Sequence, residues 1–265
     1  MLERIKSIIC HPRYIGKYHN DKVWKILLYV FLFLVLYLAV FGVRTFTENP
    51  LGEEANTIII SDVISLQRYN VKYDSNTHLL TGEETTIVKE SYGLYVLPQT
   101  EVKVSPFSVN IIMKEDKAFV CQGAKVVSEI KYSDIAVGDF TFEGLSKNNP
   151  TDIYNFRVYL YLILESSFIY YRTLNFVQGA VEAIGMYALM FLLAFIFAKL
   201  INPTIEGKVR AKLVMYDTII YFVVAILTCL FNVAGLIYVA YSLPIIYTSI
   251  TFRHIVRVVV PKRGV

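Results

Sequence analysis

The feature that most constrains this chain is an apolar run over residues 26–43, ILLYVFLFLVLYLAVFGV, which contains no charged side chain. A helix of about 20 apolar residues is long enough to cross the hydrocarbon core of a bilayer. Only 18% of the whole chain is charged, against roughly 25% in ordinary globular domains. The sequence therefore predicts an integral membrane protein.

Three further apolar stretches cover residues 177–201, 213–231 and 233–252. Together with the first run they predict a helical membrane protein with four transmembrane helices. Almost no loop separates the last two stretches, so we expect them to form a tight helical hairpin. The first run is longer than the apolar core of a cleavable signal peptide, which has about 7–15 residues, so it is interpreted as an uncleaved signal anchor.

The stretch 152–175 is also apolar, but it carries Glu165 and Arg172 seven residues apart. This spacing places both charges on one stripe of a helix. We therefore predict an amphipathic helix that lies at the membrane interface and does not cross the bilayer.

The distribution of basic residues predicts the orientation. Lysine and arginine accumulate in cytoplasmic loops. An even number of spans places the N-terminal segment 1–25, the loop 202–212 and the tail 253–265 on the same, cytoplasmic side. The N-terminal segment holds six basic residues: Arg4, Lys6, Arg13, Lys17, Lys22 and Lys25. The loop, counted from Lys199, holds four: Lys199, Lys208, Arg210 and Lys212. The tail holds another four: Arg253, Arg257, Lys262 and Arg263.

Residues 44–151 differ from the rest of the chain and are predicted to form an extracytoplasmic domain. They carry 10 basic and 15 acidic residues, whereas the chain as a whole has a net charge of +4. Alternating apolar residues predict a β-rich α+β fold. The expected strands are 86–88, 92–98, 108–113, 118–121 and 125–130, with a hairpin turn at 114–117 and a short helix at 62–68.

The sequence contains none of the spaced residue motifs that mark catalytic, nucleotide-binding or metal sites. The four histidines are scattered along the chain, so we expect neither a shared metal site nor a catalytic histidine. The three cysteines fall into three predicted compartments, which excludes an intramolecular disulfide framework. The basic residues follow from topology and attraction to lipid headgroups, so nucleic acid is not an expected partner. No cofactor is implied.

Charged residues within apolar segments are costly and are the best candidates for a functional site. Glu165, Arg172 and Glu182 form one hypothesis, a polar cluster at the outer interface that binds a lipid, a sugar or a partner. The alternative, which we favour, is structural: Glu182 pairs with Arg172, and Asp217 pairs with Arg210 or Lys212.

The layout resembles a family of uncharacterised membrane proteins of low-GC Gram-positive bacteria that is associated with maltodextrin-utilisation genes. The resemblance rests on three segments: the basic opening HPRYIGKYHNDKVWKILLYV, the inserted segment PFSVNIIMKEDKAFVCQGAKVVSEIKYSDI, and the close of the last span, Tyr241-Ser242-Leu243-Pro244, with its basic tail. It implies a protein of the bacterial plasma membrane that assists carbohydrate uptake, without catalytic residues to carry over.

Three functions remain open from the sequence. The favoured one is a non-enzymatic accessory or regulatory membrane protein that acts through its outer domain and docks its helices onto a partner such as a sugar-transport permease. A small transporter or channel component is the second. A membrane enzyme acting on lipid or cell-wall substrates is the third.

Overall fold

The computed structural model describes residues 2–50, 55–65, 70–100, 102, 104 and 108–255, and the chain divides into two compact units. The helical unit comprises Met1–Glu48 and Asn175–Val265. The β-rich unit comprises Asn49–Leu174.

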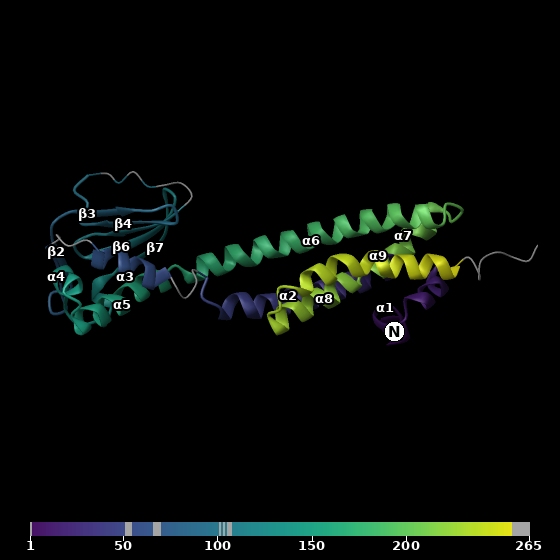
Figure 1. Ribbon diagram of the computed structural model, residues 1–265, viewed down its shortest axis with the longest axis horizontal. Helices are drawn as coiled ribbons and strands as arrows, with labels where there is room; N and C mark the ends of the chain where they lie inside the picture. Colours follow the sequence, from purple (N-terminus) through teal and green to yellow (C-terminus); the bar gives the residue numbers. More distant parts are fainter. Residues whose placement is uncertain are drawn as a thin grey trace, which may run out of the picture. The chain divides into compact units, whose positions relative to one another are not determined.

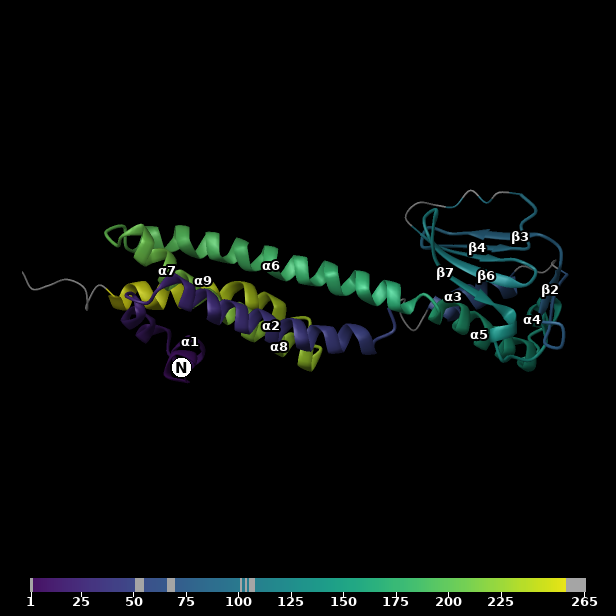
Figure 2. The same ribbon diagram turned by 180° about the vertical axis from the view of Figure 1, so that it is seen from behind.

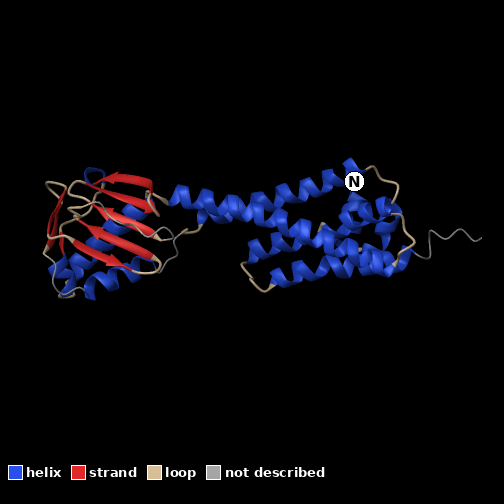
Figure 3. Ribbon diagram, turned by 90° about the horizontal axis from the view of Figure 1, so that it is seen from above, coloured by secondary structure: helices blue, strands red, loops and turns tan. Residues whose placement is uncertain are grey.

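In its described residues the β-rich unit contains two sheets, several helices and the beginning of α6 (Figures 1 and 3). One sheet has the strand order β2-β1-β8 and is antiparallel, and the other has the order β3-β4-β5-β6-β7, in which only β4 and β5 run parallel. The strands are β1 (Val71–Asp74), β2 (Leu79–Gly82), β3 (Thr85–Val88), β4 (Tyr92–Val96), β5 (Val109–Met113), β6 (Lys117–Gln122), β7 (Lys125–Lys131) and β8 (Phe140–Thr141). The helical elements are α3 (Ala55–Ser65), the short 3-10 turn η2 (Tyr132–Asp134), α4 (Phe142–Ser146) and α5 (Pro150–Glu165).

The core of this unit lies between the five-stranded sheet and helices α3 and α5, which run along one of its faces (Figure 1). Ile111 and Val120 are paired across β5 and β6, and both are buried, as period-two alternation requires. From α5, Phe156 and Tyr159 enter the same core. Pro150 at the first helical position and Asn149 as N-cap, which accepts from the Thr151 amide, set the start of α5.

The helical unit is built from α1 (Leu2–Cys10), the 3-10 helix η1 (Pro12–Tyr18), α2 (Val23–Thr47), the part of α6 (Phe168–Ile201) from Asn175 onward, α7 (Gly207–Thr218), α8 (Ile220–Phe231) and α9 (Leu236–Ile255). Helix α8 packs against both α2 and α9, as both views show (Figures 1 and 2). Asn232 ends α8 in the left-handed conformation, with φ of 52°, which asparagine tolerates at a helix C-terminus. The predicted hairpin between the last two apolar stretches is therefore confirmed.

Among the described residues, three helices are long and apolar enough to cross a membrane: Val23–Thr47, Phe168–Ile201 and Gly207–Phe231, the last made of α7 and α8 together. The sequence predicted four. Helix α9 has 20 residues but contains Tyr, Ser, Thr, Arg253 and His254, and it is not one of the three. The second apolar helix also begins at Phe168 and not at 177, so it is longer than the sequence suggested.

The prediction of one amphipathic helix over 152–175 is wrong in its local structure. The segment contains the end of α5, a break at Ser166 and Ser167, and the start of α6. The apolar face of α5 packs into the core of the β-rich unit. An amphipathic stripe indicates that one face is covered, but it does not say what covers it.

The strands predicted at 86–88, 92–98, 108–113, 118–121 and 125–130 are confirmed as β3 to β7, and β1, β2 and β8 are additional. The helix predicted at 62–68 overlaps the end of α3, while residues 66–68 lie outside the described residues. The same holds for residues 256–265 of the predicted basic tail. The three cysteines are all free: Cys10 is exposed, Cys121 is buried and Cys229 is intermediate.

Candidate functional site

Glu182 lines a cavity of about 200 Å³ in the helical unit, called here the Glu182 cavity. Four helices contribute to it. The lining residues are Tyr37 and Phe41 from α2; Gly179, Glu182 and Ala183 from α6; Tyr221, Ala225, Thr228 and Cys229 from α8; Ile237 and Tyr241 from α9. Glu182 itself is exposed, so the cavity opens at the surface of the unit.

Two stacked pairs of aromatic rings form walls of the Glu182 cavity. Tyr37 and Phe41 stack with a centroid distance of 5.6 Å and an interplanar angle of 8°. Tyr221 and Tyr241 stack at 6.3 Å and 12°. The Glu182 carboxylate lies near enough to Tyr37, Tyr221 and Tyr241 to interact electrostatically with each of them. A single carboxylate is thus placed near tyrosine side chains from three other helices.

Gly179 is what allows α2 to lie this close to α6. A Cβ atom at this position would lie 2.3 Å from Cζ of Phe41, far inside van der Waals contact. Ala183, one turn further along, is buried. A small residue at each of these two positions permits the close approach of helices that such a spacing favours in membranes.

Asp217 lies in a second polar site, fully buried where α7 and α9 pack together. Its Oδ1 accepts a hydrogen bond of 2.7 Å from the Thr251 hydroxyl, which also lies 3.0 Å from the Pro12 carbonyl oxygen. Within the described part of the chain, Asp217 Oδ2 and Thr248 Oγ1 are buried and make no hydrogen bond of good geometry, although the Thr248 hydroxyl lies close to the carboxylate. Asp217 therefore links η1, α7 and α9 through Thr251.

The ion pairs predicted for these two carboxylates do not form. Arg210 donates to the carbonyl oxygens of Asn202, Pro203 and Ile205 and so fastens the turn between α6 and α7. Lys212 donates to the His19 carbonyl at 3.5 Å, at the limit of hydrogen bonding.

Glu182 and Arg172 are ten residues apart on α6, which corresponds to about 15 Å along a helix, too far for an ion pair. Glu165 is exposed at the end of α5, and the Arg172 guanidinium lies 5.5 Å from the centroid of the Phe168 ring. Glu165 and Arg172 belong to the β-rich unit and Glu182 to the helical unit, so the cluster of these three residues stays a prediction from the sequence.

A further polar cluster secures the N-terminal segment to the helical unit. The Arg4 guanidinium donates two hydrogen bonds to Asp21, at 3.0 and 3.1 Å, and the Tyr216 hydroxyl donates a third, at 2.7 Å. Burial raises the pKa of Asp21, but the hydrogen bonds from Tyr216 and Arg4 outweigh it, so the pKa lies below its usual value. Asp21 is thus held ionised as the acceptor that joins α1 to α7.

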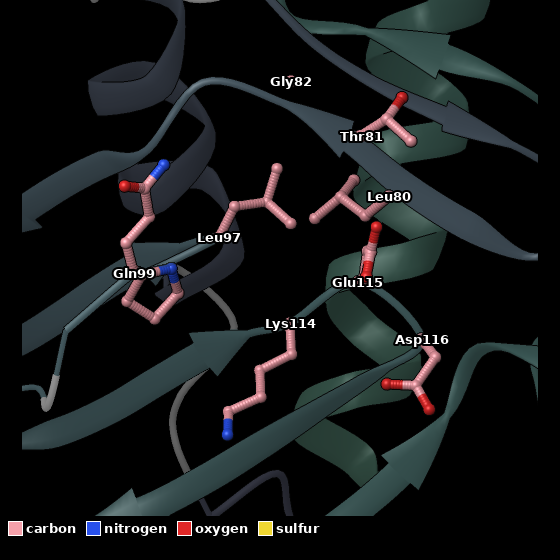
Figure 4. A pocket seen from close by; sticks show the side chains of 9 residues that line it. Leu80, Thr81, Gly82, Leu97, Gln99, Lys114, Glu115 and Asp116 are labelled. Atoms are coloured by element: carbon pink, nitrogen blue, oxygen red, sulfur yellow. The ribbon is translucent and has the colours of Figure 1, made fainter.

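The β-rich unit has a cleft of about 440 Å³ where the end of β2 meets the ends of β4 and β5 (Figure 4). Leu80 and Leu97 point toward each other at its centre, and Gln99 and Lys114 lie at its rim (Figure 4). Its lining comprises Leu80, Thr81, Gly82, Leu97, Pro98, Gln99, Lys114, Glu115 and Asp116. The cleft is lined by two leucines and a proline together with charged side chains of both signs.

One buried side chain holds the turn that forms a wall of this cleft. The Tyr132 amide donates to the Asp116 carbonyl at 3.0 Å, and the Tyr132 hydroxyl donates to the Lys114 carbonyl at 2.8 Å. Burial raises the pKa of Tyr132 well above its usual range, so the phenol remains a neutral donor. The Leu80 amide, which donates to the Glu115 carbonyl at 2.8 Å, ties β2 to the same turn.

Sequence reasoning singled out Glu182 and Asp217 but missed their neighbours. Thr248 and Thr251 are three residues apart and share a helical face, and this spacing in the sequence indicates a polar stripe on the helix. The tyrosines around Glu182 come from three separate helices, so no local pattern brings them together. Groups of three or more His, Cys, Asp or Glu side chains suited to a metal ion do not occur in the described ranges.

Comparison of this chain with protein-family models, with curated proteins and with solved structures finds no match.

Proposed function

We propose that this chain is a multi-pass protein of the bacterial plasma membrane that serves as a non-enzymatic accessory or regulatory subunit. Insertion is supported by the uncovered apolar surface of its helices. Only 22% of the most apolar window of α2 and 17% of that of α6 are buried within the protein. Val43, Val181 and Leu200 are 68%, 65% and 74% exposed. Lipid or another membrane protein would cover these side chains.

In this proposal α9 crosses the membrane as a fourth span. Its 20 residues correspond to about 30 Å, the thickness of the hydrocarbon core. It packs against α8, α7 and η1, and its buried Thr251 hydroxyl faces Asp217 of α7 and the Pro12 carbonyl of η1, away from lipid. An even number of crossings leaves both termini on the cytoplasmic side, in agreement with the basic residues that surround α1 and η1.

The accessory role is carried by one observation: a β-rich unit with its own core accompanies apolar helices of which two, α2 and α6, are mostly uncovered. The cleft between β2 and the 114–116 turn offers a binding place for a partner's loop. The helices offer a surface for docking within the bilayer. A sugar-transport permease is the partner that the resemblance to maltodextrin-associated proteins suggests.

Site-specific photocrosslinking in native membranes tests this role. A photoreactive residue in place of Gln99 reports on the cleft, and the same residue in place of Tyr154, which is 67% exposed on α5, serves as the control. We expect one stoichiometric membrane-protein adduct from Gln99 that also co-purifies with the unmodified chain in mild detergent. A chain that purifies alone and gives no adduct from either position would contradict the accessory role.

A second function, a small transporter or channel component, is favoured by the Glu182 cavity, because a carboxylate within a helical bundle is typical of substrate and ion pathways. Flux through liposomes that contain only this chain would distinguish the two. Transport that is lost in Glu182→Gln supports the transporter, while a tight liposome supports the accessory role.

A further inference from the structure

The Glu182 cavity has an unbalanced charge. Glu182 is the one charged side chain among its lining residues, all of which the structure describes. The remaining lining is apolar and aromatic, and its other polar groups are the phenol hydroxyls of Tyr37, Tyr221 and Tyr241, the hydroxyl of Thr228 and the thiol of Cys229. A carboxylate in such surroundings is stabilised by an opposite charge close to it. The cavity therefore has the electrostatic character of a cation site that its own chain does not fill.

The aromatic rings indicate which kind of cation the Glu182 cavity would bind. Aromatic faces carry a negative quadrupole and attract cations placed within about 6 Å of the ring centroid. Tyr37 and Phe41 belong to α2, Tyr221 to α8 and Tyr241 to α9, so a ligand in the cavity would meet aromatic side chains from three helices. A divalent metal ion prefers several carboxylate and carbonyl oxygens, whereas this lining supplies one carboxylate and otherwise neutral hydroxyls. A methylated ammonium group, weakly hydrated and apolar at its surface, fits this lining better.

The size of the cavity sets a further limit. At about 200 Å³ it is smaller than the roughly 300–1,000 Å³ of pockets for drug-sized ligands. An oligosaccharide would not fit, whereas a single ammonium head group would. Because the cavity opens at the surface of the helical unit, the rest of a larger molecule can remain outside while its head group enters.

We propose that the Glu182 cavity binds an organic ammonium group, with Glu182 as its counter-ion and the rings of Tyr37, Phe41, Tyr221 and Tyr241 as its aromatic cage. The ammonium can belong to a free solute or to a lipid head group. The proposal concerns a ligand of the helical unit, so it stands or falls independently of the accessory role of the β-rich unit.

The test uses the full-length chain in nanodiscs of anionic phosphatidylglycerol, with choline as the probe. Dimethylbutanol, the neutral carbon isostere of choline, and lithium chloride, which matches the ionic strength, are the controls. We expect saturable binding of choline by calorimetry and a concentration-dependent rise in Tm, with neither effect from the two controls. Equal binding of the neutral isostere would overturn the proposal, because recognition would then not depend on charge.

Variants separate the carboxylate from the rings. Glu182→Gln, which keeps the shape and removes the charge, should weaken choline binding by about tenfold or more, and Glu182→Asp should retain part of it. Tyr241→Phe keeps the ring and should bind almost normally, whereas Tyr241→Leu should bind more weakly. Glu165→Gln, an exposed position in the other unit, is the matched control and should not change binding.

The source of the ammonium is decided by native mass spectrometry in the presence of phosphatidylcholine. Retention of phosphatidylcholine by the unaltered chain but not by Glu182→Gln assigns the site to a lipid head group. Binding of choline without such retention assigns it to a free solute. Choline binding that is unchanged in Glu182→Gln, or the absence of both choline and phosphatidylcholine binding, refutes the proposal.

Discussion

The two buried tyrosines beneath the cleft should respond in opposite directions to the loss of their hydroxyl groups. Tyr132 and Tyr159 are both fully buried, with ring centroids 5.2 Å apart. The Tyr132 hydroxyl donates to the Lys114 carbonyl. The Tyr159 hydroxyl has the Tyr132 hydroxyl as its polar neighbour, but among the described residues it makes no hydrogen bond of good geometry. Tyr132→Phe and Tyr159→Phe are thus chemically identical changes with different structural consequences.

The expected magnitudes follow from hydrogen bonding. A hydrogen bond contributes about 0.5–1.5 kcal/mol net, and an unsatisfied buried polar group costs about 1–3 kcal/mol. Tyr132→Phe removes the donor to Lys114 and should lower the free energy of unfolding of the β-rich unit by about 1–2 kcal/mol. Tyr159→Phe removes an unsatisfied hydroxyl and should raise that free energy by about 1 kcal/mol.

Hydrogen exchange measured by mass spectrometry on the full-length chain reports both effects, because amide protection in a folded unit reflects its opening free energy. Peptides that cover β5 and β6 should exchange faster in Tyr132→Phe and more slowly in Tyr159→Phe. Equal destabilisation by both variants would refute the reasoning, since it would mean that the two hydroxyls share a hydrogen bond.

Three predictions concern the helical unit. Gly179→Val should lower the Tm, and it should lower the free energy of unfolding by about 1–3 kcal/mol, because the added side chain overpacks the contact with Phe41. Gly185→Val is the control, since a Cβ added there has no atom within 4 Å. Equal effects of the two variants would assign the loss to helix propensity. Thr251→Val should cost about 1–3 kcal/mol and expose the N-terminal segment to proteolysis. Thr248→Val should cost less, because the Thr248 hydroxyl makes no hydrogen bond of good geometry; the reverse order would contradict the assigned hydrogen bonds. Because the folded-state pKa of Asp21 is depressed, the stabilisation that Asp21 provides should be fully present above its ordinary pKa of 3.8 and be lost as the pH falls below that value. The loss should appear as faster hydrogen exchange in the N-terminal segment. Asp21→Asn should abolish this acid dependence, and an acid dependence that persists in the variant would exclude Asp21 as its cause.

Local patterns in the sequence predicted those elements that bury their side chains regularly. Strand β5 alternates strongly enough to be recognised, and its partner β6 follows after a short polar turn. Strand β8 has only two residues, Phe140 and Thr141, and its pairing with β1 depends on a distant part of the chain. No periodicity exists in two residues, so such a strand is visible only in the folded unit.

The candidate sites illustrate the same limit. Glu182 and Asp217 were recognisable because charged residues are rare in apolar segments. Their environments were not, because Tyr241 reaches Glu182 and Thr251 reaches Asp217 only after separate helices pack. The sequence predicted ion pairs with nearby basic residues, but Arg210 instead satisfies the backbone carbonyls at the end of α6. Proximity in sequence was therefore a poor guide to the partner of a buried charge.

The three unpaired thiols differ in accessibility, so their reactivity can report on the membrane topology of the chain. Cys10 is exposed in α1, while Cys121 is buried in β6 and Cys229 is partly covered in α8. A maleimide that cannot cross membranes would therefore react first with Cys10, and only from the compartment that contains the N-terminal segment. Protection of Cys10 in intact cells and its modification in inverted vesicles would establish the side on which the chain begins, without any engineered residue.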